Sequence, residues 1–120
     1  SKAAADQVLQ AEAAERNAIR QKLESAYYEH RAALSQIIAA NASYNAARDA
    51  YRDTRARFEF GLADYTDLAD TISSLTRAME QKAEAMTFAN LSYAQLLREL
   101  VYVPRNPEDS VDLPITLPQI

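Results

Sequence analysis

The sequence predicts an all-α protein: a long antiparallel coiled-coil helical hairpin followed by an extended tail. Three observations lead to this prediction. The chain of 120 residues contains one glycine, Gly61, and all four of its prolines lie at or after Pro104. Alanine fills 24 positions, and alanine, glutamate, arginine and leucine are strong helix formers. Apolar residues recur every seven positions on both sides of Gly61, as expected for helices that pair along their length.

The first helix is expected to span about residues 3–60. Its predicted seam combines large residues at intervals of seven with small ones three positions later. The large residues are Leu23, His30, Ile37, Tyr44, Tyr51 and Phe58, and the small ones are Ala26, Ala33, Ala40, Ala47 and Thr54. Such a repeat imposes a left-handed supercoil, and a bulky side chain can face an alanine when two helices approach closely. Periodicity alone fits any helical hairpin equally well.

The turn is expected at residues 61–63, within a hairpin that covers residues 1–101. Gly61 can adopt the left-handed conformation that ends a helix, and Leu62 sits where an apolar residue commonly packs back on the last turn. Asp64 is a favourable N-cap for a second helix at about 64–101. Asp67 follows three positions later, near the positive end of the helix dipole. A break this short folds the two helices antiparallel.

The seam predicted for the second helix is interrupted at Lys82. It comprises Tyr65, Leu68, Ile72, Leu75, Met79, Met86, Ala89, Tyr93, Leu96 and Leu100. Residues 102–120 are expected to form an extended tail, and the apolar stretch 111–118 can be an edge strand or a docked extended segment but not a central strand, because prolines interrupt it. Four apolar residues lie off both seams and need another surface, so we expect the hairpin to self-associate. They are Tyr27, Leu34, Ile38 and Leu97.

Composition argues against catalysis and against nucleic-acid binding. The net charge is −4, and no basic stripe stands apart from acidic neighbours. The chain has no cysteine, and its single histidine, His30, cannot complete a metal site alone. We therefore expect His30 to have a packing or register role in the seam. We expect no enzymatic activity, no metal and no cofactor. A group of arginines near the end of the first helix could bind an acidic partner, but Asp49, Asp53 and Glu59 alternate with it, so the pattern favours a self-compensated exposed face. These arginines are Arg48, Arg52, Arg55 and Arg57.

The turn region carries the most specific pattern in the chain. Within residues 57–70, an aromatic residue, a glycine and a small polar cap precede two aspartates at fixed spacing. These residues are Phe58, Gly61, Asp64, Asp67 and Asp70. The stretch resembles the helix–glycine–helix signature of the TolC-like outer-membrane efflux proteins, and residues 1–100 resemble the C-terminal periplasmic hairpin of that family. Phe58 and Ala63 depart from the pattern, because they lack the hydroxyl and the guanidinium with which some members hold the tip shut.

The resemblance implies a periplasmic tunnel segment of a homotrimeric efflux duct in the outer membrane of a Gram-negative cell. Such a duct exports small molecules or proteins together with an inner-membrane pump and a periplasmic adaptor, and its membrane strands would lie outside these residues. By this resemblance Phe58, Gly61, Leu62 and Asp64 would form the tip that contacts the adaptor. Asp67 and Asp70 would form acidic rings at the constriction. Two other interpretations are the α-hairpin of a periplasmic adaptor, whose Val- and Gly-rich lipoyl-like flanks are not visible here, and a structural coiled-coil scaffold.

Overall fold

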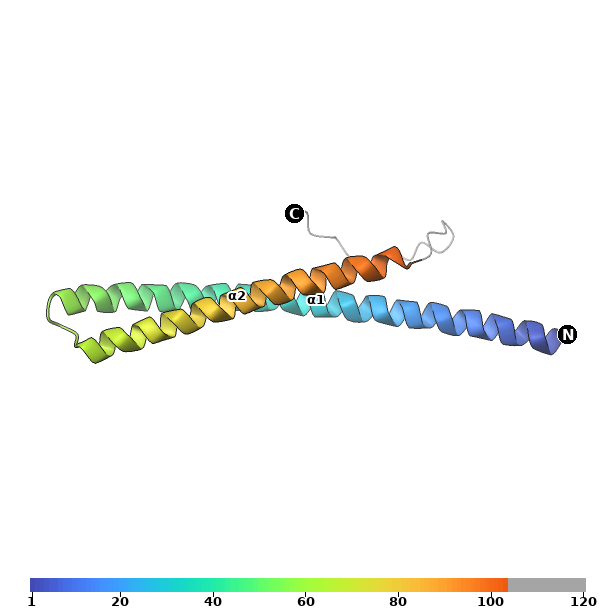
Figure 1. Cartoon of the computed structure of the whole chain (residues 1–120), viewed down its shortest axis with the longest axis horizontal. Coiled ribbons are helices and arrows are strands. Elements are labelled where there is room, and N and C mark those ends of the chain that lie inside the picture. Colours follow the sequence, from blue (N-terminus) through green and yellow to red (C-terminus); the bar gives the residue numbers. More distant parts are fainter. Residues whose placement is uncertain (104–120) are drawn as a thin grey trace. The chain divides into compact units, whose positions relative to one another are not determined.

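The computed structural model is an all-α helical hairpin, described here for residues 1–103 (Figure 1). Helix α1 spans Lys2–Glu59 and helix α2 spans Tyr65–Val101, so the bounds differ from the expected ones by at most one residue. No strand occurs within residues 1–103. Tyr102 and Val103 form a turn after α2, and the tail predicted from Pro104 onward lies outside the described residues.

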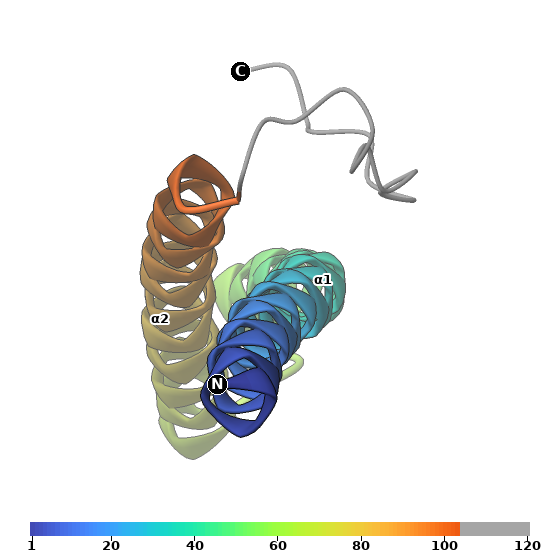
Figure 2. The same cartoon turned by 90° about the vertical axis from the view of Figure 1, so that its right-hand side faces the viewer.

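The chain divides into two compact units. The turn unit consists of residues 31–91 and contains the connection between the helices. The terminal unit consists, in its described part, of residues 1–30 and 92–103. Within the turn unit, the segments of α1 and α2 lie side by side and run antiparallel (Figures 1 and 2).

Burial confirms the seam predicted for α1. The buried and half-buried positions follow alternating steps of three and four residues, which keeps them on one face of a helix. They include Leu23, Ala26, His30, Ala33, Ile37, Ala40, Tyr44, Ala47, Tyr51 and Thr54. Only the last predicted position, Phe58, is exposed, because it lies one turn before the end of the pairing.

The seam predicted for α2 is wrong at four positions. Tyr65, Ile72, Met79 and Met86 are all exposed, by 46% or more, and we call them the outer stripe. The face of α2 that is covered lies one position away and includes Lys82. Its residues are Leu68, Thr71, Leu75, Ala78, Lys82, Ala85, Ala89, Ser92 and Leu96. Small residues at every seventh position of this face (71, 78, 85 and 92) allow a close approach to the large residues of α1, whereas methionine and isoleucine would hold the helix axes farther apart.

A small apolar core closes the terminal unit. Leu23, Ala26 and Leu96 form a buried cluster, against which Tyr27, Leu100 and Val103 pack. Leu96 has no exposed surface, and burying a side chain of this size stabilises the fold by about 1.5–3 kcal/mol. In contrast, residues 1–18 of α1 are exposed throughout. The pairing of the hairpin therefore stabilises α1 only from about Ile19 onward.

Candidate interaction site at the helical turn

The end of α1 is fixed by two backbone hydrogen bonds. The amide of Leu62 donates to the carbonyl of Arg57 at 2.7 Å, and the amide of Gly61 donates to the carbonyl of Phe58 at 3.0 Å. These are the two bonds of a Schellman motif, which requires a left-handed residue after the helix. Gly61 supplies it with a φ of 75°. The sequence prediction for Gly61 is confirmed.

The start of α2 is capped reciprocally by two aspartates. The Asp67 amide donates to Oδ1 of Asp64 at 2.8 Å, and the Asp64 amide donates to Oδ2 of Asp67 at 3.2 Å. Two amides that the helix itself cannot satisfy are thereby satisfied, as in a capping box. The Asp67 carboxylate also lies in the first turn of α2, where the helix dipole favours a negative charge. Together with the Schellman motif, this cap makes the connection of residues 60–64 a well-defined turn.

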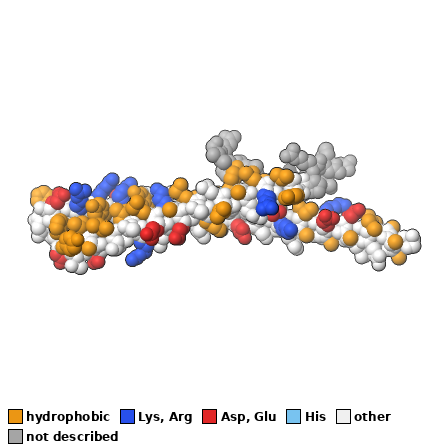
Figure 3. Space-filling model, viewed as in Figure 1, with side chains coloured by type: hydrophobic (Ala, Val, Ile, Leu, Met, Phe, Trp, Pro, Cys, Tyr) orange, Lys and Arg blue, Asp and Glu red, His pale blue; other side chains and the backbone are white. Residues whose placement is uncertain are grey.

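Four exposed apolar side chains occupy this turn. The exposed fractions are 38% for Phe58, 81% for Phe60, 72% for Leu62 and 75% for Tyr65, and we call these residues the apolar tip. Figure 3 shows hydrophobic side chains gathered over the end of the molecule that carries the turn. Contiguous exposed apolar surface is typical of a protein contact site.

Sequence reasoning assigned Phe58 and Leu62 to this tip and missed Phe60 and Tyr65. The expectation that Leu62 packs back on the last turn of α1 is wrong, because most of its side chain is exposed. Tyr65 follows the seven-residue spacing of the α2 seam, so the pattern predicts burial for it, whereas its side chain is 75% exposed. Phe60 lies between the helix and the glycine, where helical periodicity no longer predicts which side faces solvent.

Asp70, the second aspartate predicted at a constriction, is exposed like Asp67. It lies three residues after Asp67, so the two carboxylates occupy neighbouring positions on α2. Asp67 is engaged in the cap, whereas Asp70 makes no hydrogen bond or ion pair with any described residue. Of the two, Asp70 is thus the carboxylate that the local structure of α2 does not use.

His30 lies in a polar layer of the terminal unit, as its position in the α1 seam predicts. It is 6% exposed, its Nδ1 lies 3.0 Å from Oγ of Ser92, and its ring is tilted against Tyr93 with 5.4 Å between ring centres. Its Nε2 is buried without a hydrogen-bond partner. Within residues 1–103 no group of three or more potential ligands is close enough to hold a metal ion.

The arginines near the end of α1 are largely compensated, as the alternation of charges predicts. Three of them contact carboxylates of the same helix. The pairs are Arg48 with Asp49 at 3.5 Å, Arg55 with Glu59 at 3.4 Å and Arg57 with Asp53 at 3.9 Å. The side chains of all three pairs are at least 36% exposed, so each pair contributes no more than about 1 kcal/mol. Arg52 is different, because it pairs with none of the described residues.

Neither α1 nor α2 contains an apolar stretch long enough to cross a membrane. Comparison with protein-family models, with curated proteins and with solved structures finds no match to this chain.

Proposed function

We propose that this hairpin is a periplasmic tunnel segment of a TolC-type outer-membrane efflux duct, and that the apolar tip is its contact with a periplasmic adaptor. The observation that carries the proposal is the apolar tip itself. Phe60, Leu62 and Tyr65 are each more than 70% exposed on a turn that is fixed by backbone bonds on both sides. Because the turn is already fixed before a partner binds, less conformational entropy is lost on binding. This favours a role in docking over a role as a simple link between the helices.

A tunnel made of several hairpins also explains the outer stripe. Ile72, Met79 and Met86 repeat every seven residues and lie 46%, 54% and 49% exposed, next to the face of α2 that α1 covers. A heptad stripe of this kind is suited to packing against a further helix. In a duct, the hairpin of a neighbouring subunit would supply that helix, in keeping with a homotrimeric parent protein.

In the same proposal, Asp67 and Asp70 line the constriction of the duct. Carboxylates that three subunits bring together around an axis repel one another, which opposes closure, and they attract cations. The exposure of both side chains supports this role. Asp70 supports it more strongly, because the described chain gives its carboxylate no other task.

Site-specific photo-crosslinking in cells tests the proposed tip contact. A photoreactive residue in place of Leu62 should capture a periplasmic adaptor, whereas the same residue in place of Glu84 should not. Both positions are exposed and lie in the turn unit, so Glu84 controls for access and for chemical reactivity.

Two results would contradict the proposal. Equal capture of the adaptor from both positions would show that proximity alone produces the crosslink. Capture of only copies of the same chain from Leu62 would favour a structural coiled-coil scaffold.

A further inference from the structure

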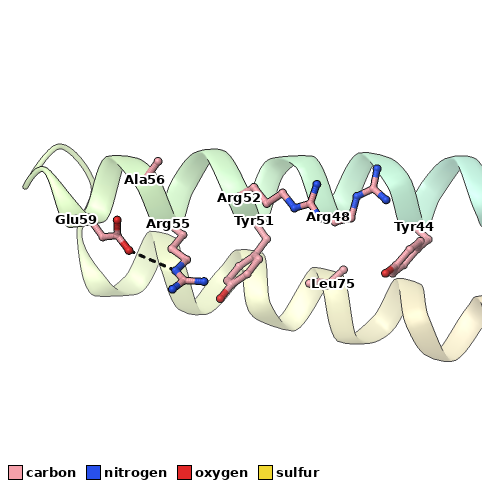
Figure 4. A pocket seen from close by; sticks show the side chains of 8 residues that line it. All are labelled: Tyr44, Arg48, Tyr51, Arg52, Arg55, Ala56, Glu59 and Leu75. Carbon is pink, nitrogen blue, oxygen red and sulfur yellow. Dashed lines mark ion pairs between the residues drawn. The ribbon is translucent and has the colours of Figure 1, made fainter.

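A shallow groove of about 550 Å³ runs along the side of the turn unit. Its residues come almost entirely from α1, and Leu75 is the contribution of α2 (Figure 4). We call it the arginine groove, after Arg48, Arg52 and Arg55, which follow one another at steps of four and three residues on one side of α1. It is separate from the apolar tip.

The guanidinium groups of this groove have unused hydrogen-bonding capacity. Arg52 makes no hydrogen bond or ion pair within residues 1–103. Arg48 has one weak hydrogen bond, 3.5 Å from its Nη2 to Asp49, and its guanidinium carbon lies 5.9 Å from the centre of the Tyr44 ring. Its Nε is buried without an acceptor. Only Arg55 has a counter-ion in the groove itself, Glu59, and both of those side chains are 61% exposed. Three cations and one carboxylate leave the groove positively charged.

The floor of the arginine groove is apolar and aromatic. Tyr44 and Tyr51 project from α1 toward α2, and Leu75 lies on α2 (Figure 4). All three side chains are half-buried, so each still offers part of its surface. A cation–π contact holds the ring of Tyr44, because Nζ of Lys82 lies 4.6 Å from the centre of that ring. The floor is therefore an ordered surface for an apolar side chain.

We propose that the arginine groove binds an amphipathic helix of another protein that carries carboxylates along one edge. Arginine binds carboxylates through two parallel hydrogen bonds, which makes a row of arginines selective for Asp and Glu. The first and last of the three arginines are seven residues apart, about 10 Å along α1, so one small anion would reach only part of the row. A helix with Glu at steps of three and four residues matches the whole row, and its apolar edge would lie on Tyr51 and Leu75.

A second copy of this chain does not offer the complementary row. The acidic residues close to the groove on α1 are already paired with arginines of their own helix. Elsewhere in the described chain, unpaired carboxylates recur at steps of three or four only in twos, Glu12 with Glu15 and Glu80 with Glu84. The one row of three is Asp64, Asp67 and Asp70, and its first two members already serve the cap of α2. This inference is independent of the proposed duct, because it concerns the side of the hairpin and not its tip.

Two synthetic peptides of about 20 residues test the proposal with the full chain. One repeats Leu at heptad spacing with Glu along one edge, and the other has Lys at every Glu position. The Glu peptide should bind at least about tenfold more tightly in fluorescence anisotropy, and its binding should weaken as salt is raised. Arg52→Glu should weaken binding of the Glu peptide about tenfold and strengthen binding of the Lys peptide. Arg77→Glu is the matched control, since Arg77 is an exposed arginine of the same unit outside the groove, and it should change neither affinity more than about twofold.

Circular dichroism of both variants establishes that the helices persist, which is expected because both substitutions are at exposed positions. Equal binding of the two peptides overturns the proposal, and so does an equal effect of Arg52→Glu and Arg77→Glu. Loss of self-association in Arg52→Glu alone, measured by sedimentation equilibrium without any peptide, would also overturn it, because the occupant would then be a second copy of the chain.

Discussion

Asp64 and Asp67 cap each other across the first turn of α2, each accepting a hydrogen bond from the other's backbone amide at 2.8 and 3.2 Å. This reciprocity assigns Asp67 a structural task in addition to its proposed place at a constriction. Asp70, three residues on, has no such task. The two aspartates of the sequence motif are therefore expected to respond differently to substitution.

Replacing Asp67 with Ala should lower the free energy of unfolding by about 0.5–1 kcal/mol, because a capping bond and a favourable dipole interaction are lost. Asp70→Ala should change it by less than about 0.5 kcal/mol, since the side chain has no partner among the described residues. Urea denaturation followed by circular dichroism measures both. A loss at Asp70 as large as that at Asp67 would contradict this assignment.

In the proposed efflux duct, Asp67→Ala with Asp70→Ala should increase single-channel conductance or change block by cations. The reason is that carboxylates around a narrow axis raise the local negative potential. Asp70→Ala alone should reproduce most of this effect without the loss of stability. Unchanged conductance in a double variant that unfolds earlier would leave helix capping by Asp67 as the only role found for either aspartate.

Gly61→Ala should destabilise the hairpin by about 1–2 kcal/mol through backbone strain alone. A Cβ at this position would meet no atom within 4 Å, but its φ of 75° is unfavourable for a residue with a side chain. Gly61→Asn is the control, because asparagine tolerates the left-handed conformation better and should cost less. Thermal unfolding of the two variants side by side makes the comparison, and equal losses would argue against strain as the cause.

Replacing His30 with Leu and Ser92 with Ala together should leave stability unchanged or raise it by about 1 kcal/mol. Both partners of a buried polar contact are then removed, along with the unsatisfied Nε2 of the histidine. The double variant should also allow α1 and α2 to pair in more than one register, because polar residues in a seam often specify a single register. Disulfide trapping between cysteines placed on α1 and α2 reports the register. A single register with a large loss of stability would contradict this view of the layer.

Polar substitutions in the outer stripe should abolish self-association while the helices persist. Ile72→Gln combined with Met79→Gln removes exposed apolar surface that a second helix would cover, so the chain should sediment as a monomer. Leu91→Gln is the control, because Leu91 is 65% exposed but lies off the stripe, and it should leave association unchanged. Equal effects of the stripe and control variants would place the contact elsewhere.

The features that the sequence predicted correctly depend on local rules. A glycine followed three residues later by a capping aspartate specifies the turn, since only short-range backbone bonds are involved. The α1 seam was equally predictable, because large residues and alanines recur on a single stripe. The bounds of both helices follow from these two features.

The pairing face of α2 depended on tertiary packing. The apolar and small residues of α2 surround more of the helix than one partner helix can bury. Two neighbouring faces of α2 therefore fit the seven-residue repeat equally well. A helix with large seam residues packs closely against small ones, and accordingly Ala78 and Ala85 of α2 are buried while Met79 and Met86 are exposed. Close packing thus brought Lys82 into the seam beside Tyr44 and left the outer stripe in solvent. The sequence alone determined that this chain is a capped helical hairpin, and only side-chain volume across the helix pair decided which apolar surface remains for a partner.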